Sequence, residues 1–309
     1  MPVLFRFLVF SAATLLFAAV LFYPAWLGVS GFADIDPQKV LLRFAKLLAA
    51  IGLVFFLKRM GLWERGLLGF GVPRRRFFAG LGAGWVTGIL IMAALLGMLG
   101  LLDVRTFQPE KLTPSLFAGV VPKAIVAGLA VGLIEETFFR GALFGGIRRQ
   151  TGLWQAALVS ALFYAALHFL RTQPLPAGTP IDWTTGLHLL TGAFDKFASP
   201  GIWDSFAALT AAGVLLALLR AWHGSIAVAM GVHAGWVTTI KIAKDITDPV
   251  ADAPLGFLIG TYDHIIGWLA AAWLLALIVI AARPAQAREA AHAGQYGAGS
   301  QAASTRPRS

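Results

Sequence analysis

Long runs of apolar residues dominate the chain, and polar residues gather in the short segments between them. A helix needs about 20 predominantly apolar residues to cross the hydrocarbon core of a bilayer. On that criterion the pattern predicts eight membrane-spanning helices, at residues 4–29, 38–57, 77–102, 115–147, 153–170, 201–221, 225–243 and 262–282. The first run is too long for the apolar part of a signal peptide and lacks a clear cleavage site, so it counts as a span. We therefore predict an all-α, polytopic membrane protein.

Charged residues alternate in sign from loop to loop, and this alternation predicts the orientation. The loop 58–76 carries a dense set of Lys and Arg residues against a single Glu, and Arg148, Arg149 and Arg220 follow on the same side. The opposite loops carry mainly Asp. Because cytoplasmic loops are enriched in Lys and Arg, an even number of spans places both termini in the cytoplasm.

The chain is expected to divide into four parts. Residues 1–110 hold the first three spans, 111–245 a core, 246–284 the last span, and 285–309 a disordered cytoplasmic tail rich in Ala, Gly, Ser, Gln and Arg. The longest interruption, 172–200, is expected to be an external loop or a partly re-entrant lid. In the third span, Gly80, Gly84 and Gly88 recur every four residues, which predicts close packing with another helix.

Composition supports the membrane class and excludes several others. Hydrophobic residues make up 58% of the chain and charged residues 13%, about half the share typical of soluble domains. The absence of Cys excludes disulfides and Cys-based metal or thiol chemistry. The net charge of +10 lies in short loops between spans, so it indicates topology and not nucleic-acid binding. From the compact, Ala-, Leu-, Gly- and Arg-rich composition we expect a bacterial inner membrane.

Three ionisable residues lie inside one predicted span, in the stretch EETFFR. Charged groups in a membrane are costly, so they indicate a functional site. Glu136 and Arg140 are four residues apart on one helical face and can form an ion pair. Glu135 lies about 100° around the helix, where it is free to act as a general acid or base. A purely structural role for all three is the alternative.

Two histidines lie in later spans, His168 in FYAALHFL and His233 in GVHAGW. Tyr164 shares a helical face with His168. Measured from the predicted cytoplasmic ends, Glu135 lies about 18 Å deep, His233 about 12 Å and His168 about 22 Å. The three can therefore meet in one layer and activate a water molecule, with Glu135 taking its proton. One histidine can position that water and the other can stabilise an oxyanion.

These residues resemble the signature of a known family, the CAAX protease and bacteriocin-processing (ABI, type II CAAX prenyl endopeptidase) intramembrane proteases. The family pattern is EExxxR, then FxxxH, then HxxxN on later helices. Here the matching stretches are EETFFR, YAALH and HAGWV, and the resemblance covers roughly residues 115–243. It implies a glutamate-dependent endopeptidase that cleaves a membrane-associated peptide or protein. Glu135 would activate water with help from His168, His233 would help to hold the oxyanion, and Glu136 and Arg140 would support the site.

Two positions depart from the family pattern. Tyr164 replaces the first Phe of FxxxH, which exchanges one ring for another. Val237 stands where the family often has Asn, so one polar contact to an oxyanion is missing, and the indole N–H of Trp236 is the candidate replacement.

Several alternatives stay open at this point. Glu135, His168 and His233 could hold a divalent metal such as zinc, but we expect no cofactor because Glu135 is needed as the base. The chain could be a non-catalytic immunity or scaffold protein of the same fold, or a proton-coupled transporter. GVSG at Ser30 and TYD at Asp263 are weak matches to other intramembrane protease motifs. Weaker polar candidates near span ends are His188, His223, Asp204, Lys241, Asp263 and His264.

Overall fold

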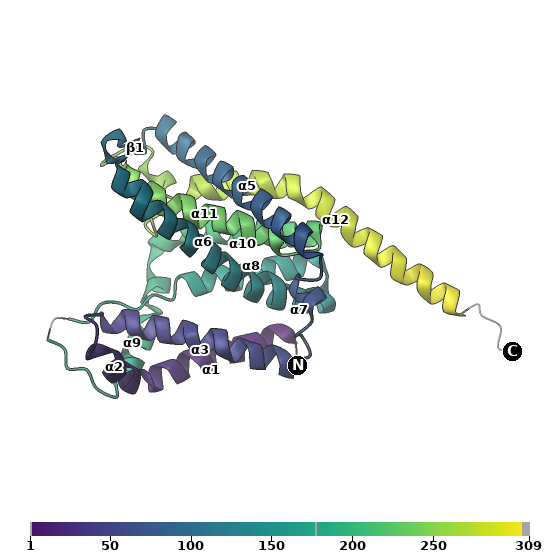
Figure 1. The fold of residues 1–309 in the computed structure, drawn as a ribbon, viewed down its shortest axis with the longest axis horizontal. Helices are drawn as coiled ribbons and strands as arrows, with labels where there is room; N and C mark the ends of the chain where they lie inside the picture. Colours follow the sequence, from purple (N-terminus) through teal and green to yellow (C-terminus); the bar gives the residue numbers. More distant parts are fainter. Residues whose placement is uncertain (1, 177, 305–309) are drawn as a thin grey trace.

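The computed structural model describes residues 2–176 and 178–304, and its helices lie side by side in a bundle (Figure 1). The predicted all-α membrane fold is confirmed. A short antiparallel ribbon adds to it, in which β1 (Arg105–Phe107) pairs with β2 (Thr247–Pro249).

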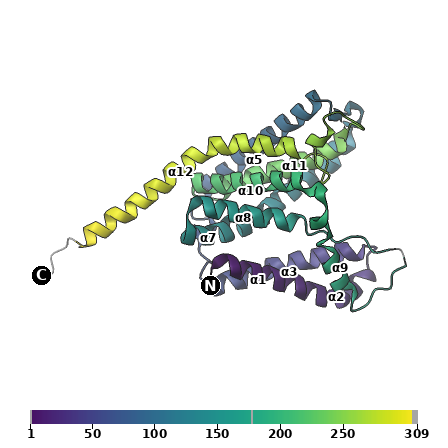
Figure 2. The ribbon, with the colours of Figure 1, turned by 180° about the vertical axis from the view of Figure 1, so that it is seen from behind.

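The helices form two groups, seen from both sides in Figures 1 and 2. The N-terminal unit comprises α1 (Val3–Val20), α2 (Phe22–Ser30), α3 (Pro37–Arg59) and α9 (Thr185–Gly192). The main body comprises α4 (Arg65–Leu68), α5 (Arg74–Leu101), α6 (Val121–Glu136), α7 (Phe144–Thr151), α8 (Leu153–His168), α10 (Trp203–His223), α11 (Ala227–Ile246) and α12 (Trp268–Ser304). Two π-helical segments flank α6, η2 (Leu116–Val120) and η3 (Thr137–Leu143). Short 3₁₀ turns lie at Pro109–Lys111, Asp195–Ala198, Pro200–Ile202 and Gly256–Leu258.

A helix occupies most of each of the eight predicted spans, but the count of eight is not established. Within the described residues, 6 helices are long and apolar enough to cross a membrane, at Val3–Val20, Pro37–Arg59, Arg74–Leu101, Leu116–Thr151, Trp203–His223 and Trp268–Ala291. The apolar helix α8 is shorter than these. The helix α11 has 20 residues but carries Lys241, Lys244 and Asp245 near its end, which lowers its hydropathy.

The first predicted span, 4–29, is not one helix. It breaks at Leu21 into α1 and α2. Pro24 explains the break, because it has no N–H to donate to the carbonyl of Val20 and its ring collides with that carbonyl in a continuous helix.

Most of the stretch predicted as a disordered tail, from residue 285, is helical in the structure. The helix α12 continues to Ser304, and its extension leaves the bundle (yellow in Figures 1 and 2). Ala285 is fully buried, and Glu289 forms an ion pair with Arg148. The alanines that suggested low complexity are also the strongest helix formers, which explains the difference. Residues 305–309 of the predicted tail lie outside the described residues.

The segment 172–200 contains α9, which packs against the other three helices of the N-terminal unit. Gly186 makes this approach possible, since a Cβ there would overlap the carbonyl oxygen of Ala19. Ala18, Phe22, Val40, Leu41, Ala45 and Leu189 form a hydrophobic core of this unit, separate from the core of the main body.

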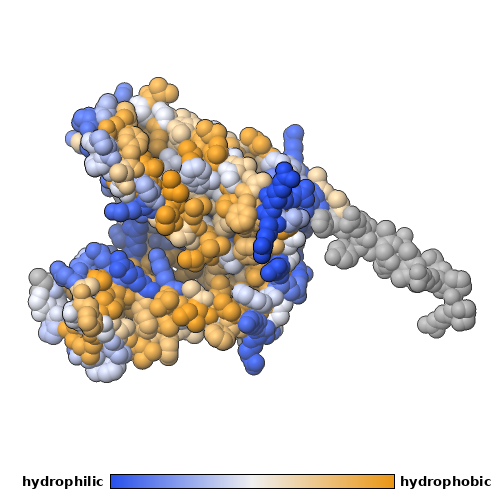
Figure 3. All heavy atoms as spheres, in the orientation of Figure 1, coloured by the Kyte–Doolittle hydropathy of each residue, from blue (hydrophilic) through white to orange (hydrophobic). Residues whose placement is uncertain are grey.

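The two groups of helices are joined at one end and separated along the rest of their length. Phe7 of α1 contacts Phe138 of η3, with ring centroids 5.5 Å apart, and also contacts Phe56 of α3 at 4.9 Å. Beyond this junction the space-filling view shows a deep hollow between the N-terminal unit and the main body (Figure 3). We refer to it below as the hollow.

The helices α5 and α11 are locked together by glycines on both sides. A Cβ at Gly84 or Gly88 would overlap the carbonyl oxygens of Val228 or Val232, and Gly231 and Gly235 of α11 lie equally close to the backbone of α5. The predicted packing role of the glycines in the third span is confirmed. This contact fixes the part of α11 that carries His233.

Gly88→Ala is expected to destabilise the protein by about 1–3 kcal/mol, because the added methyl group must push two backbones apart. Unfolding in mild detergent, followed by circular dichroism, measures the change. Gly97→Ala is the matched control on the same helix, since nothing lies within 4 Å of its added Cβ. Equal stability of the two variants would contradict this account of the packing.

Candidate active site

A buried carboxylate, Glu136, lies at the centre of the site and has no exposed surface. Its Oε1 accepts a hydrogen bond from Nη1 of Arg140 at 3.0 Å and lies 2.8 Å from Nδ1 of His233. Arg140 also donates to the carbonyl of Gly213 at 3.3 Å and lies over the ring of Tyr164, 4.5 Å from its centroid. The predicted Glu136–Arg140 pair is therefore present, and it extends to one of the predicted histidines.

Local helix geometry brings these groups together. The helix changes from α to π immediately after Glu136, and single-turn π segments are frequent at functional sites. On α6, Gly128 and Gly132 let α11 approach, since a Cβ on either would press against the backbone of α11. His233 is thereby placed within reach of both carboxylates.

The second carboxylate, Glu135, faces the two histidines. Its Oε2 lies 3.8 Å from Nε2 of His168 and 3.8 Å from Nε2 of His233. That oxygen is buried and makes no hydrogen bond within the described residues. The structure thus brings together Glu135, His168 and His233, the three residues to which the sequence assigns the chemistry.

In each imidazole ring, the hydrogen-bond partner of Nδ1 determines whether Nε2 is a donor or an acceptor. Nδ1 of His168 lies 2.9 Å from the backbone carbonyl of Tyr164, and Nδ1 of His233 faces the carboxylate of Glu136. Both partners are acceptors, so each Nδ1 carries the proton. In the neutral rings, both Nε2 atoms are then acceptors as well. Together with Glu135 they form three acceptors that face one another, and no described residue places a donor between them.

A cavity of about 310 Å³ adjoins the two histidines. Tyr164, His168, His233 and Trp236 lie on its wall, and most of the remaining wall is apolar side chains of α5, α10, α11 and α12. Nε1 of Trp236 is buried and has no hydrogen-bond partner among the described residues. Val237 also lines the cavity, so the position where the resembled family often has Asn does face the site. Glu135 is not on this wall and reaches the rings from α6.

The sequence missed the contact between Glu136 and His233, because these residues are 97 positions apart and no local spacing indicates it. Of the weaker candidates, Lys241 and Asp263 line the same cavity. Asp263 accepts hydrogen bonds from the backbone N–H groups of Ile265 and Ile266, which gives it a structural task. His188, His223, Asp204 and His264 are not on the cavity wall.

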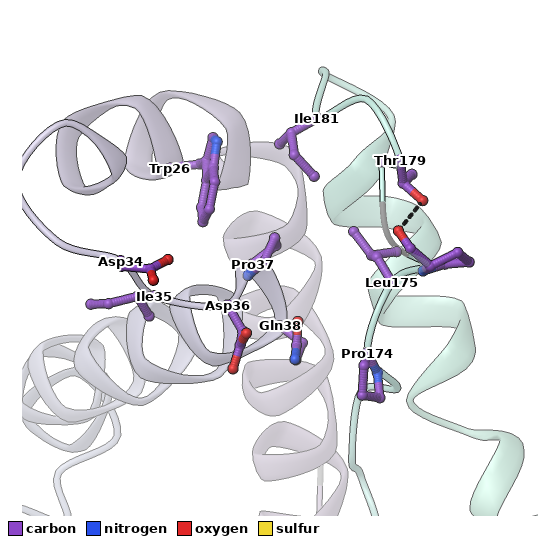
Figure 4. A pocket seen from close by; sticks show the side chains of 12 residues that line it. Trp26, Asp34, Ile35, Asp36, Pro37, Gln38, Pro174, Leu175, Thr179 and Ile181 are labelled. Atoms are coloured by element: carbon purple, nitrogen blue, oxygen red, sulfur yellow. Dashed lines mark hydrogen bonds between the residues drawn. The ribbon is translucent and has the colours of Figure 1, made fainter.

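A second cavity lies apart from these residues, at the start of α3 (Figure 4). Its walls include Trp26, Asp34, Asp36 and the loop around Thr179, whose hydroxyl donates to the carbonyl of Pro176 at 2.7 Å. It contains none of the predicted site residues.

Comparison with known proteins agrees with the resemblance seen in the sequence. Residues 117–239 match the model of the family described as type II CAAX prenyl endopeptidase Rce1-like, which is a family of proteases. No curated protein and no solved structure matches the chain. The predicted family is confirmed for residues 117–239, which include Glu135, Glu136, Arg140, Tyr164, His168, His233 and Trp236.

Arg140→Met is expected to destabilise the protein by about 3–5 kcal/mol, because it leaves the carboxylate of Glu136 buried without its cation. The double variant Glu136→Gln/Arg140→Met should recover most of that loss. It removes both charges and keeps an oxygen that accepts the proton of His233 Nδ1. Thermal unfolding of the two variants in detergent measures the coupling, and additive losses would argue against a paired role.

Proposed function

We propose that this chain, whose residues 117–239 match the type II CAAX prenyl endopeptidase family, is an intramembrane endopeptidase that cleaves a membrane-associated peptide or protein. One observation supports this proposal above the others. A buried, unpartnered carboxylate oxygen of Glu135 lies 3.8 Å from each of two imidazole Nε2 atoms.

A water molecule is the natural occupant between these atoms. Separations of 3.8 Å are too long for direct hydrogen bonds, and a bridging water can donate to two of the three facing acceptors, here Glu135 and His168. In the proposed reaction Glu135 takes a proton from that water while His168 orients it. The oxygen then attacks the carbonyl carbon of the scissile peptide bond. Glu135 afterwards delivers the proton to the leaving nitrogen, so the proton count balances.

We assign His233 the role of a donor to the oxyanion, with protons on both ring nitrogens at that step. Its Nδ1–H is held by the carboxylate of Glu136, so its Nε2–H is the one that points toward the reacting atoms. Arg140 is the buried counter-charge of Glu136, 3.0 Å away. Glu136 and Arg140 therefore act as positioning residues, and Glu135, His168 and His233 carry the proposed chemistry.

Trp236 supplies a second donor in the proposed mechanism. Its indole Nε1 is buried without a partner on the wall of the cavity that also holds His233 and His168. An unpaired buried N–H is costly unless something binds to it, and the oxyanion of the tetrahedral intermediate is a suitable acceptor. Trp236 would thus replace the polar contact that Val237 cannot make.

A metal ion is the other occupant that three facing acceptors could hold. Histidines whose Nδ1 is fixed by a carbonyl or carboxylate are typical of zinc sites, so Glu135, His168 and His233 are chemically suitable ligands. Within the described residues, however, no group of three His, Cys, Asp or Glu side chains has a metal-binding arrangement. The proposed reaction instead needs Glu135 as the base, so we predict activity that persists after rigorous chelation.

Glu135→Gln is expected to abolish cleavage, by a factor of at least about 10², while leaving stability nearly unchanged. The amide keeps the shape of the side chain but cannot take a proton. Glu136→Gln is the matched comparison and should lower both stability and activity, because it leaves Arg140 buried without its counter-charge. The assay uses protein in reconstituted membranes with a panel of membrane-anchored peptides, with and without chelator. Wild-type-like turnover by Glu135→Gln would overturn the proposal, and no cleavage by the wild type across the panel would favour a scaffold.

Trp236→Phe is expected to lower kcat by about 10²-fold with little change in KM, since an oxyanion donor acts in the transition state. The variant keeps an aromatic ring at this position but loses the indole N–H, so packing near His233 should largely persist. Kinetics of the purified variant on the best peptide of the panel measure the effect. Full activity would exclude the indole N–H as a donor.

A further inference from the structure

The helix α3 carries a row of cations that the sequence patterns above do not use. Lys39, Arg43 and Lys46 follow one another at intervals of four and three residues, which places them on one face of the helix. All three are exposed. The opposite face of α3 packs into the N-terminal unit through its buried residues, chiefly Val40, Leu41 and Ala45. The cationic face therefore points away from the unit to which α3 belongs.

Two of these cations lie within the membrane-spanning length of the helix. Arg43 and Lys46 lie about 9 Å and about 14 Å from the Pro37 end of α3, at 1.5 Å per residue. Lys39 at the helix end pairs with Asp36 at 2.6 Å, whereas no ion pair with Arg43 or Lys46 is found among the described residues. Cations at such depth are costly in hydrocarbon and normally face a polar cavity or a partner of opposite charge.

The hollow provides that polar space. Figure 3 shows hydrophilic side chains gathered along the edge of the N-terminal unit that borders the hollow. On the other side of the hollow, Phe138 of η3 meets Phe7 of α1. Glu135 precedes Phe138 by three residues, so it shares this side of its helix, and 28% of its side chain is exposed. The hollow therefore runs from the cationic face of α3 toward the carboxylate of the site.

We propose that the row Lys39, Arg43 and Lys46 binds an acidic segment of the peptide substrate that enters through the hollow. This inference rests on the proposed function for its occupant and adds a preference in substrate charge. From Lys39 to Lys46 the row is about 10 Å long. An extended peptide covers the same length in about three residues. Carboxylates of an extended peptide can thus meet successive cations while the peptide bond to be cleaved lies at Glu135.

An acidic peptide fits the row better than the headgroup of an anionic lipid. Lipid phosphates lie at the membrane surface, where they can reach Lys39, which already has a carboxylate partner. Arg43 and Lys46 lie deeper, below the headgroup layer of a bilayer whose hydrocarbon core is about 30 Å thick. A peptide can place carboxylates at that depth because Arg43 and Lys46 compensate their charge there.

Binding can be tested without cleavage, so failure of this inference is distinguishable from failure of the protease proposal. The probe is a fluorescent apolar peptide containing three Glu residues, compared with its Gln counterpart. The protein is the Glu135→Gln variant in nanodiscs of neutral phosphatidylcholine. We expect the acidic peptide to bind at least about fivefold more tightly than the neutral one. Adding Arg43→Gln and Lys46→Gln should remove that difference.

Two further variants make the result decisive. Lys58→Gln/Arg59→Gln, which removes two cations at the other end of α3, should leave the preference intact. Charge reversal by Arg43→Glu/Lys46→Glu should make the protein bind a peptide with Lys in place of Glu more tightly than the acidic peptide. Equal binding of acidic and neutral peptides overturns the proposal. A second outcome also overturns it. If Arg43→Gln/Lys46→Gln leaves peptide binding unchanged but reduces the phosphatidylglycerol retained by the protein in native mass spectrometry, the row is a lipid site.

Discussion

The buried carboxylate of Glu136 is the interaction on which the rest of the site depends. A single oxygen contacts the guanidinium of Arg140 on its own helix and the imidazole of His233 on another. Arg140 extends the link to the carbonyl of Gly213, so η3, α10 and α11 are joined through one charge pair. A buried carboxylate is tolerated only when its charge and lone pairs are matched. The helices must therefore keep this arrangement to avoid an uncompensated charge, and His233 is held in one orientation and one tautomer.

Two adjacent glutamates have different surroundings because consecutive helical residues point about 100° apart. Glu136 points into the packed interior and meets groups that compensate its charge. Glu135 points toward the edge of the bundle and meets two imidazole nitrogens at a distance that leaves room between them. The same step along the helix that separates the side chains also separates a carboxylate with a matched charge from the carboxylate to which we assign the proposed chemistry. The close contacts at Gly128 and Gly132 maintain this division by holding α11 against α6.

Local and periodic features of the fold could be predicted from the sequence. Apolar runs located the helices, the spacing of four located the Glu136–Arg140 pair, and the depth of each residue brought Glu135, His168 and His233 into one layer. Features that depend on distant partners could not be predicted. The contact of Glu136 with His233 requires the crossing of α6 and α11, and the helical continuation at Ala285 requires a surface on which to pack. The spacing that places the cations of α3 on one helical face can be read from the sequence. The hollow that this face borders cannot, because it arises where two groups of helices meet near Phe7 and Phe138 and separate beyond them.

The position of the site between two spaces of different character constrains how a substrate can lie in it. On one side, the histidines and Trp236 face a cavity whose wall is mostly apolar. On the other side, Glu135 is absent from that wall and shares a helical side with Phe138, which borders the hollow and its cationic face. In the proposed reaction, a peptide bond attacked by the water between Glu135 and the imidazoles would therefore have one flank in each space. Its apolar flank gains free energy by entering the cavity, and its polar or acidic flank avoids the cost of desolvation by staying in the hollow. For the proposed peptide substrate, the asymmetry of the two spaces would thus set the direction of the bound chain, independently of any contact at the scissile bond itself.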